Sequence, residues 1–201
     1  MSHHRPDWDS AYRGRDAHDL SWFEARPDTS LDLLALTNLP PTSGVVDVGA
    51  GSSPFLQHLS SMGWTDLTAV DLSTQAMADL HLRRPSIKTE VADICDWRPG
   101  RQFDLWHDRA ALHFLTETAD QAAYVRTMET VLRPNGYAII GTFAPDGPER
   151  CFGQPVHRYD GERLSDTLGE GFNIMSQCRH VHLTPGGTEQ RYFYALVRRK
   201  G

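Results

Sequence analysis

A short run near residue 50 combines an acid with two glycines in a spacing that suits ligand binding. Asp47 lies in the apolar run 45–48, and Gly49 and Gly51 flank one small residue directly after it. Glycine is needed where a side chain would block the approach of a ligand to the backbone, or where φ must be positive. A carboxylate at this turn would repel a pyrophosphate but would tolerate a cationic or hydroxyl-bearing ligand. The run therefore predicts a strand, a tight turn and a helix start that admit such a ligand.

Further acids stand at corresponding positions of the next predicted strands. Asp71 closes the run 67–70, Asp93 closes 87–92, and Asp108 follows 103–107. Ligands of open parallel sheets bind outside the carboxyl ends of the strands. The acids therefore predict a binding site along one edge of a sheet.

The elements that position these acids alternate between strand and helix patterns. Strands are predicted at 45–48, 67–70, 87–92, 103–107 and 137–143. Three helices are predicted between these strands. The first is capped by Ser52 or Ser53, the second is capped by Ser73, and the third runs from about Thr118 to Leu132. This alternation favours an α/β sheet of parallel strands with helices on both faces.

The pattern changes towards the C-terminus. Two long strand-like runs, 172–183 and 190–198, meet around Pro185-Gly186-Gly187. Adjacent strands joined by a short loop that contains glycine pair antiparallel. We therefore expect a seven-stranded, mostly parallel sheet that ends in an antiparallel hairpin.

The composition bounds the class of protein. The chain has 201 residues, of which 39% are hydrophobic and 23% charged, so it suits a globular fold with a full core. Its formal net charge of −6 disfavours a nucleic-acid partner, which needs a basic face. No apolar run approaches the roughly 18 residues of a membrane-spanning helix, and no apolar signal core is present at the N-terminus. We therefore expect a cytoplasmic protein without a membrane partner.

Together these residues resemble the class I S-adenosylmethionine-dependent methyltransferases, and the resemblance extends from Trp8 to Arg198. Asp47-x-Gly49-x-Gly51 is similar to the first motif of that family, with Ser53 where a third glycine is usual. The turn Leu132-Arg133-Pro134-Asn135-Gly136 is similar to the family's Leu-(Arg/Lys)-Pro-Gly-Gly. The resemblance implies a Rossmann-like fold and S-adenosyl-L-methionine as the cofactor.

The same resemblance implies a role for each group along the sheet edge. The glycines let the methionine part of the cofactor lie against the backbone, Asp71 accepts both ribose hydroxyls, and Asp93 with Ile94 clamps the adenine. The cofactor-binding residues that it implies are Trp8, Tyr12, Trp22, Asp47, Gly49, Gly51, Asp71, Leu72, Asp93, Ile94 and Asp108.

Three of these residues are aromatic and precede the first strand. Trp8 and Tyr12 are four residues apart and therefore share one face of a helix, and Trp22 follows. The pattern is similar to the lid of a methyltransferase subgroup that includes some protein-lysine methyltransferases. The alternative is an amphipathic helix that packs its aromatics on the core, and the two interpretations are compatible.

Methyl transfer from a sulfonium is a direct in-line displacement, for which a protein supplies proximity, alignment and exclusion of water. A base is needed only if the nucleophile arrives protonated. Asp108 matches a cofactor-proximal position of the family, and His113 stands where many small-molecule relatives carry Leu-His-His, so both are catalytic candidates. The alternative for His113 is packing with a hydrogen bond to a carbonyl, and His107 is a candidate for the packing layer of the sheet.

The acceptor of the methyl group is left open by the sequence. The turn-rich segments 143–151 and 157–160 predict a substrate rim, where Arg158 and Tyr159 either recognise a substrate carboxylate or belong to a loop with paired charges. The Asn/Asp-Pro-Pro-(Tyr/Phe) signature of base methylation is absent, since Asp108-Arg109-Ala110 stands there. A lysine side chain and a small thiol, amine or carboxylate remain candidates, and the short chain favours a small acceptor.

We expect a single methyltransferase domain over 1–201, with lid helices in 1–40, a cofactor-binding half in 41–145, and the substrate rim and hairpin in 146–201. The three cysteines are unpatterned and predict neither a disulfide framework nor a metal site. One alternative function is a cofactor-binding module that regulates a partner without catalysis. The other is a nicotinamide-dependent oxidoreductase, which predicts Gly-x-Gly-x-x-Gly where this chain has Pro54 and leaves Asp47 and Asp93 unexplained.

Overall fold

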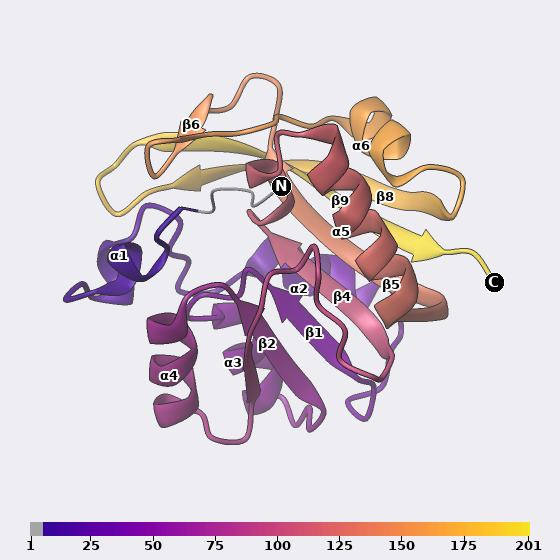
Figure 1. The fold of residues 1–201 in the computed structure, drawn as a ribbon, viewed down its shortest axis with the longest axis horizontal. Helices are drawn as coiled ribbons and strands as arrows, with labels where there is room; N and C mark the ends of the chain where they lie inside the picture. Colours follow the sequence, from indigo (N-terminus) through magenta and orange to yellow (C-terminus); the bar gives the residue numbers. More distant parts are fainter. Residues whose placement is uncertain (1–5) are drawn as a thin grey trace.

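The computed structural model describes residues 6–201, and its centre is a seven-stranded sheet in the order β3-β2-β1-β4-β5-β9-β8 (Figure 1). The strands are β1 (Val45–Val48), β2 (Leu67–Asp71), β3 (Lys88–Val91), β4 (Phe103–Arg109), β5 (Leu132–Phe143), β8 (Phe172–Leu183) and β9 (Glu189–Arg199). The five neighbouring strands β3, β2, β1, β4 and β5 pair in parallel, and β9 pairs antiparallel with both β5 and β8. The predicted fold class, a mostly parallel sheet with an antiparallel C-terminal hairpin, is confirmed.

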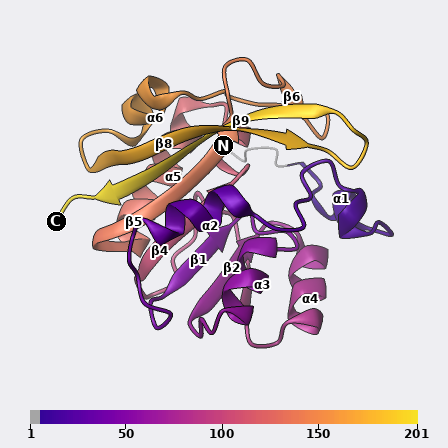
Figure 2. The same ribbon diagram turned by 180° about the vertical axis from the view of Figure 1, so that it is seen from behind.

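Helices cover both faces of this sheet, and Figure 2 shows α2 and α3 in front of it with α5 behind. The helices are α1 (Asp9–Tyr12), α2 (Asp28–Ala35), α3 (Pro54–Ser61), α4 (Thr74–Arg83), α5 (Thr118–Val131) and α6 (Gly161–Leu168), with short 3-10 turns η1 (Ala17–Asp19) and η2 (Leu112–Phe114). Helices α2, α3 and α4 contribute to one hydrophobic core, and α5 and α6 to another. The central strand separates the two cores, because Val45 belongs to one and Val46 to the other, as the alternation of side chains along a strand requires.

Serine caps start the two helices beside the carboxyl ends of β1 and β2. The Ser53 hydroxyl accepts a hydrogen bond from the Leu56 amide at 3.2 Å, and the Ser73 hydroxyl accepts one from the Ala76 amide at 3.0 Å. Such caps satisfy amides that have no partner in the first turn of a helix. They confirm the predicted starts of α3 and α4 and fix the path of the chain away from the sheet edge.

Two strands differ from their predicted ranges by more than one residue at an end. β4 continues two residues beyond 107, which carries Arg109 to the sheet edge. β5 begins at Leu132, which pairs with Phe103, and the next paired residue is Tyr137 opposite Leu105. The segment 133–136, predicted as a turn before the strand, is therefore an irregularity within it, where Asn135 has a φ of 65°.

A small hairpin lies in the predicted substrate rim and was not predicted from the sequence. It pairs β6 (Arg150–Cys151) with β7 (Gln154–Pro155). Its two turn residues, Phe152 and Gly153, have φ values of 48° and 73°, the left-handed conformation that two-residue hairpin turns of type I′ require. A phenylalanine is an unusual choice there, because non-glycine side chains rarely adopt positive φ.

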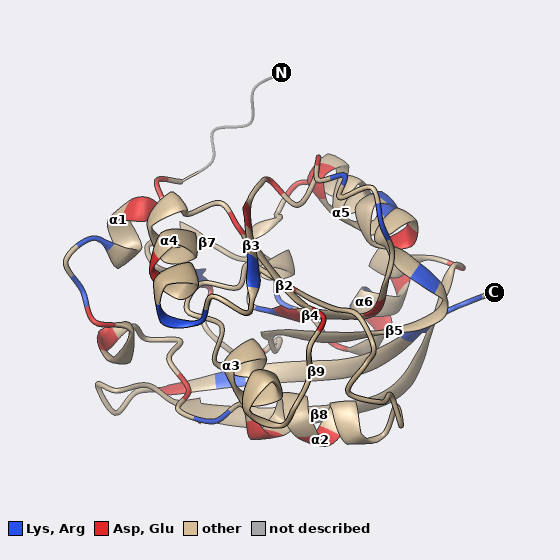
Figure 3. Ribbon diagram, turned by 90° about the horizontal axis from the view of Figure 1, so that it is seen from below, with Lys and Arg blue, Asp and Glu red and all other residues tan. Residues whose placement is uncertain are grey.

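Charged residues are dispersed over the molecule. Figure 3 shows Lys and Arg interspersed with Asp and Glu along the chain rather than gathered on one element. Within residues 6–201, no helix is both long enough and apolar enough to cross a membrane.

Candidate functional site

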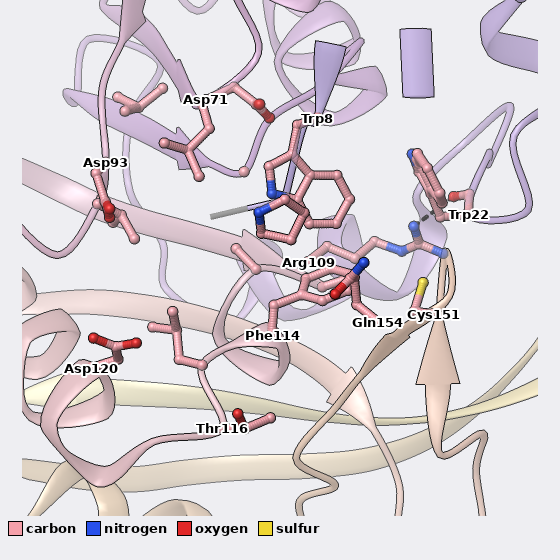
Figure 4. Close-up of a pocket in the computed structure, with 18 of the residues that line it drawn as sticks. Trp8, Trp22, Asp71, Asp93, Arg109, Phe114, Thr116, Asp120, Cys151 and Gln154 are labelled. Atoms are coloured by element: carbon pink, nitrogen blue, oxygen red, sulfur yellow. Dashed lines mark hydrogen bonds between the residues drawn. The ribbon is translucent and has the colours of Figure 1, made fainter. Parts of the chain in front are cut away.

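A cavity of about 410 Å³ opens at the carboxyl ends of the parallel strands. Figure 4 shows Asp71 and Asp93 at one end and Trp22, Arg109 and Cys151 at the other. Between them the wall is largely aromatic and apolar, and includes Trp8, Tyr12, Leu72, Ile94, Ala111, Phe114 and Leu115. Its volume lies in the range of roughly 300–1,000 Å³ that is typical of small-molecule sites.

The glycine turn after β1 forms part of the cavity wall. Gly49 and Gly51 have φ values of 61° and 52°, and Ser53, at the position of the usual third glycine, has a φ of 43°. A Cβ on Gly51 would lie 2.4 Å from the Tyr12 hydroxyl, and one on Gly49 would lie 2.6 Å from the Ala111 Cβ. Both glycines are therefore required by conformation and by close approach.

Asp71 is bound to the glycine turn. Its Oδ2 accepts a hydrogen bond from the Gly51 amide and its Oδ1 one from the Ser73 amide, both at 2.8 Å. The carboxylate lines the cavity and is 8% exposed, and burial raises its pKa despite these amide donors. Asp93 lines the same cavity and accepts from the Cys95 amide at 2.9 Å. The structure therefore brings together the two acids to which the resemblance gives contacts with the nucleoside.

Asp47 has a different environment. Its Oδ1 lies 2.7 Å from Nδ1 of His107, its Oδ2 accepts from the Ser53 hydroxyl at 2.5 Å, and His107 in turn contacts the Ser30 hydroxyl at 2.9 Å. The carboxylate lines a narrow crevice next to the large cavity together with Gly51, and Gly49, Tyr12 and Trp22 line both. His107 is 2% exposed and stacks on Phe55 at 3.9 Å, so it lies in the packing layer, the placement the sequence raised for it.

The three aromatic residues before β1 all line the cavity. Helix α1 is a single turn, in which Tyr12 ends the helix that Trp8 precedes. The rings also contact one another and their neighbours: Trp8 meets Phe114 at 4.7 Å and Phe152 at 5.9 Å, and Tyr12 meets Trp22 at 6.3 Å. These residues therefore form an aromatic cluster at the mouth of the cavity, which combines the two interpretations of the sequence.

The two catalytic candidates do not line the cavity. Asp108 is fully buried and accepts hydrogen bonds from the Tyr124 hydroxyl at 2.7 Å and from the Ala111 and Leu112 amides at 2.8 and 3.0 Å. Burial raises its pKa to about 6 against the effect of these donors. Because the amides belong to the turn that carries Ala111 into the cavity wall, Asp108 supports that wall and does not itself line the cavity.

His113 is also fully buried. Its ring lies 4.4 Å from that of Phe114 and 4.7 Å from that of Phe143, and neither ring nitrogen has a hydrogen-bond partner among the described residues. His113 is therefore packed among aromatic rings, without the bond from its ring to a carbonyl that the packing alternative included. Burial, and then the Arg109 charge, lower its pKa to about 3, which makes it neutral and a weak base near pH 7.

Neither of the predicted carboxylate-recognition residues lines the cavity. Arg158 pairs with Glu149 at 3.2 Å and donates to the Gly147 carbonyl at 3.3 Å, and Tyr159 is fully buried. This corresponds to the alternative of a loop with paired charges.

The cavity residues that sequence reasoning did not assign to the site include Arg109, Cys151 and Gln154. Arg109 donates from Nε to the Tyr194 hydroxyl at 3.0 Å and from Nη1 to the Trp22 carbonyl at 2.7 Å. Its position at the end of a strand, in register with the acids, was the available signal. Cys151 and Gln154 are brought to the cavity by the short hairpin β6–β7, for which the sequence has no hydrophobic periodicity.

Comparisons with known proteins agree with this geometry. A family model described as "Methyltransferase domain" matches residues 46–140. EEF1A lysine methyltransferase 2 of Danio rerio is 27% identical, with 94% of this chain and 84% of that protein covered. Trans-aconitate 2-methyltransferase of Acidovorax ebreus is 28% identical over 80% of this chain, which spans only 57% of that protein.

Among solved structures, the 1,6-didemethyltoxoflavin-N1-methyltransferase of Burkholderia thailandensis, which holds 1,6-didemethyltoxoflavin and S-adenosylhomocysteine, is similar in fold. It aligns with a TM-score of 0.75 at 24% identity, covering 97% of this chain and 86% of that chain. The sheet order, the glycine turn and the family model that matches residues 46–140 support a class I S-adenosylmethionine-dependent methyltransferase.

S-adenosylmethionine is the methyl donor of this class, and the residues of the cavity fit it. Asp71 and Asp93 offer carboxylates to hydroxyl and amino groups, and the adjoining wall at Leu72, Ile94 and Leu115 is apolar, as an adenine requires. The turn at Gly49 presents backbone to the cavity without a side chain.

Proposed function

We propose that this methyltransferase acts on a small-molecule acceptor, which enters the cavity at the end formed by Trp22, Arg109 and Cys151. The observation that carries the proposal is that one cavity joins this end to the two acids at the other end (Figure 4). The cavity of about 410 Å³ has to hold the cofactor together with the reacting part of the acceptor, which favours a small one.

The cofactor-binding roles follow from the placement of the residues. Asp71 would hold the ribose hydroxyls, Asp93 the adenine amine, and Leu72 and Ile94 the faces of the ring. Gly49 and Gly51 would lie against the methionine part, and Asp47 lines the crevice beside them. Trp8, Tyr12 and Trp22 would cover the bound cofactor.

When bound, S-adenosylmethionine supplies a methyl group on a sulfonium, which the acceptor takes in one direct in-line displacement. The part played by the chain is alignment and exclusion of water. The Asp108 carboxylate fixes the turn of Ala111 against Gly49, and the rings of Trp8 and Phe114 close one side of the cavity. We therefore assign Asp108 to positioning, and leave His113 without a proton-transfer role.

A lysine side chain is the second candidate acceptor, because the lysine methyltransferase relative covers nearly the whole chain. A screen with methyl-labelled S-adenosylmethionine against a lysate, divided into protein and small-molecule fractions, separates the candidates. Label in the small-molecule fraction supports the proposal, and label in protein supports a side-chain acceptor. Cofactor binding without label in either fraction supports a non-catalytic module. An Asp71→Ala variant serves as the control for cofactor-dependent labelling.

A further inference from the structure

The segment Ser21–Glu24, here called the lid segment, is held by two strands of the sheet. It carries Trp22, which lines the cavity. From β4, Arg109 donates to the Trp22 carbonyl at 2.7 Å. From β8, Nε2 of His182 donates to the Ser21 carbonyl at 2.8 Å. The backbone on each side of Trp22 in this segment is therefore tied to the sheet.

The carboxylate of Glu24 is the centre of the same arrangement. Its Oε1 lies 3.0 Å from Nη2 of Arg109, 3.6 Å from Nε2 of His180 and 3.6 Å from Nδ1 of His182. The side chains of Glu24, Arg109 and His182 are 12%, 11% and 4% exposed, so the contacts are largely shielded from water. Burial would raise the pKa of Glu24, but the neighbouring His182 side chain and the Arg109 charge outweigh it, lower the pKa and keep the carboxylate ionised.

The polar contacts of the lid segment reach strands of the sheet, whereas the ring of Trp22 contacts other aromatic rings. Its ring meets Tyr12 at 6.3 Å and Phe152 at 6.0 Å, both of which belong to the mouth of the cavity. Arg109 and His182 belong instead to long, paired strands of the sheet. Figures 1 and 2 agree that the β8–β9 hairpin reaches over the end of the sheet where α1 lies.

We propose that Glu24 and His182 are positioning residues that hold Trp22 over the cofactor and thereby set the rate of cofactor exchange. The inference rests on the proposed placement of the cofactor in the cavity. With Glu24 ionised and bound to Arg109, the lid segment stays closed over the site. Release of S-adenosylhomocysteine requires the segment to leave β4 and β8, which breaks the ion pair of Glu24 with Arg109 and the hydrogen bonds to the Trp22 and Ser21 carbonyls.

The test measures the dissociation rate of S-adenosylhomocysteine by stopped-flow tryptophan fluorescence in the full chain. Glu24→Gln keeps the shape of the side chain and removes its charge. His182→Leu keeps the pair between Glu24 and Arg109 and removes the bond to Ser21. We expect each variant to release the ligand about tenfold faster, as the loss of one buried ion pair or one hydrogen bond in the closed state implies.

The matched control is Asp28→Asn. Asp28 pairs with Arg26 at 3.1 Å, four residues beyond Glu24, and both side chains are about two-thirds exposed at 67% and 66%. This exposed ion pair should leave the release rate unchanged. Because Glu24→Gln leaves a buried arginine without its counter-charge, thermal unfolding accompanies each measurement and His182→Leu serves as the second variant.

Acrylamide quenching of Trp22 fluorescence, assigned by Trp22→Phe, provides a readout that a merely structural role would not change. Faster release with greater quenching in both variants supports the proposal. Wild-type binding with unchanged release rates in folded variants overturns it. Failure of the wild type to bind S-adenosylhomocysteine overturns the placement of the cofactor instead, so the two failures are distinguishable.

Discussion

The Ser53 hydroxyl donates a hydrogen bond of 2.5 Å to Asp47 while it caps α3 from a left-handed backbone with a φ of 43°. One side chain therefore joins the acid of the first strand to the start of the next helix. It also explains how serine replaces the usual third glycine, since the position needs positive φ and the hydroxyl compensates for the strain through two hydrogen bonds.

Substitutions of Ser53 should separate these two effects. Ser53→Ala loses both hydrogen bonds and keeps the Cβ at positive φ, whereas Ser53→Gly loses the bonds and relieves the backbone. We expect Ser53→Ala to lower the free energy of unfolding by about 1 kcal/mol more than Ser53→Gly does. Urea unfolding of the two variants measures the difference. Equal losses would show that the backbone at this position is not strained.

Removal of the Asp71 carboxylate should weaken cofactor binding. We expect Asp71→Ala to cost about 2–4 kcal/mol of binding free energy, because charge-assisted hydrogen bonds to the ribose are lost. Titration calorimetry with S-adenosylhomocysteine measures the change. Asp79→Ala on α4 is the control and should bind like the wild type, since Asp79 accepts from Gln75 at an exposed site and does not line the cavity. Unchanged affinity in Asp71→Ala contradicts the ribose assignment.

A methyl group on Gly51 should displace Tyr12 from the cavity mouth. The added Cβ would lie 2.4 Å from the Tyr12 hydroxyl but 3.3 Å from the ring carbon that bears it. We therefore expect Gly51→Ala to weaken S-adenosylhomocysteine binding and the double variant with Tyr12→Phe to recover part of the loss. A binding titration of both variants measures this recovery.

Gly63→Ala is the matched control for backbone strain. Gly63 has a φ of 88°, and apart from its chain neighbours no heavy atom of the described residues would lie within 4 Å of a Cβ added there, so its substitution strains the backbone without a steric contact. It should reduce stability without reducing affinity. If Tyr12→Phe gives no recovery, the loss in Gly51→Ala belongs to the backbone and not to Tyr12.

The pH dependence of stability should include a contribution from His113. Its folded-state pKa of about 3 lies below the ordinary value of 6.5, so the unfolded chain takes up the proton more readily and acid destabilises the fold. Protonation of His113 in the unfolded chain should lower the free energy of unfolding by about 2 kcal/mol between pH 7 and pH 5. Asp108, with a folded-state pKa raised to about 6, contributes in the opposite direction as the pH falls.

Comparison of the wild type with His113→Phe isolates the first contribution. Urea unfolding at pH 7 and at pH 5 should show a smaller loss of stability in the variant. The same variant should retain methyl transfer, because His113 does not line the cavity. Loss of transfer in a stably folded variant would restore a catalytic role to this residue.

Much of the fold could be predicted from the sequence, because turns, helix caps and strand ends depend on the types of neighbouring residues. β1 matches its predicted range because four buried residues end at a glycine turn, and the caps at Ser53 and Ser73 use the residue types that caps prefer. The acids Asp71 and Asp93 meet at the cavity because parallel strands end on one edge.

Features that depend on tertiary packing could not be predicted from the sequence. The burial of Asp108 follows from Tyr124, a residue of α5 that lies 16 positions later. The hairpin β6–β7 is too short for periodicity, and its Phe152 lacks the usual turn chemistry because its ring packs on Trp8. The partner of Glu24 on β4 lies outside any local pattern.

The bond between His182 and the Ser21 carbonyl joins positions 161 residues apart. During synthesis the lid segment leaves the ribosome long before the strand that fastens it, because 161 residues separate them. Contacts of such long sequence separation are costly to form early in folding. The core of parallel strands can therefore assemble while the mouth of the cavity is still open, and completion of the C-terminal hairpin would be the event that makes the protein competent to retain its cofactor.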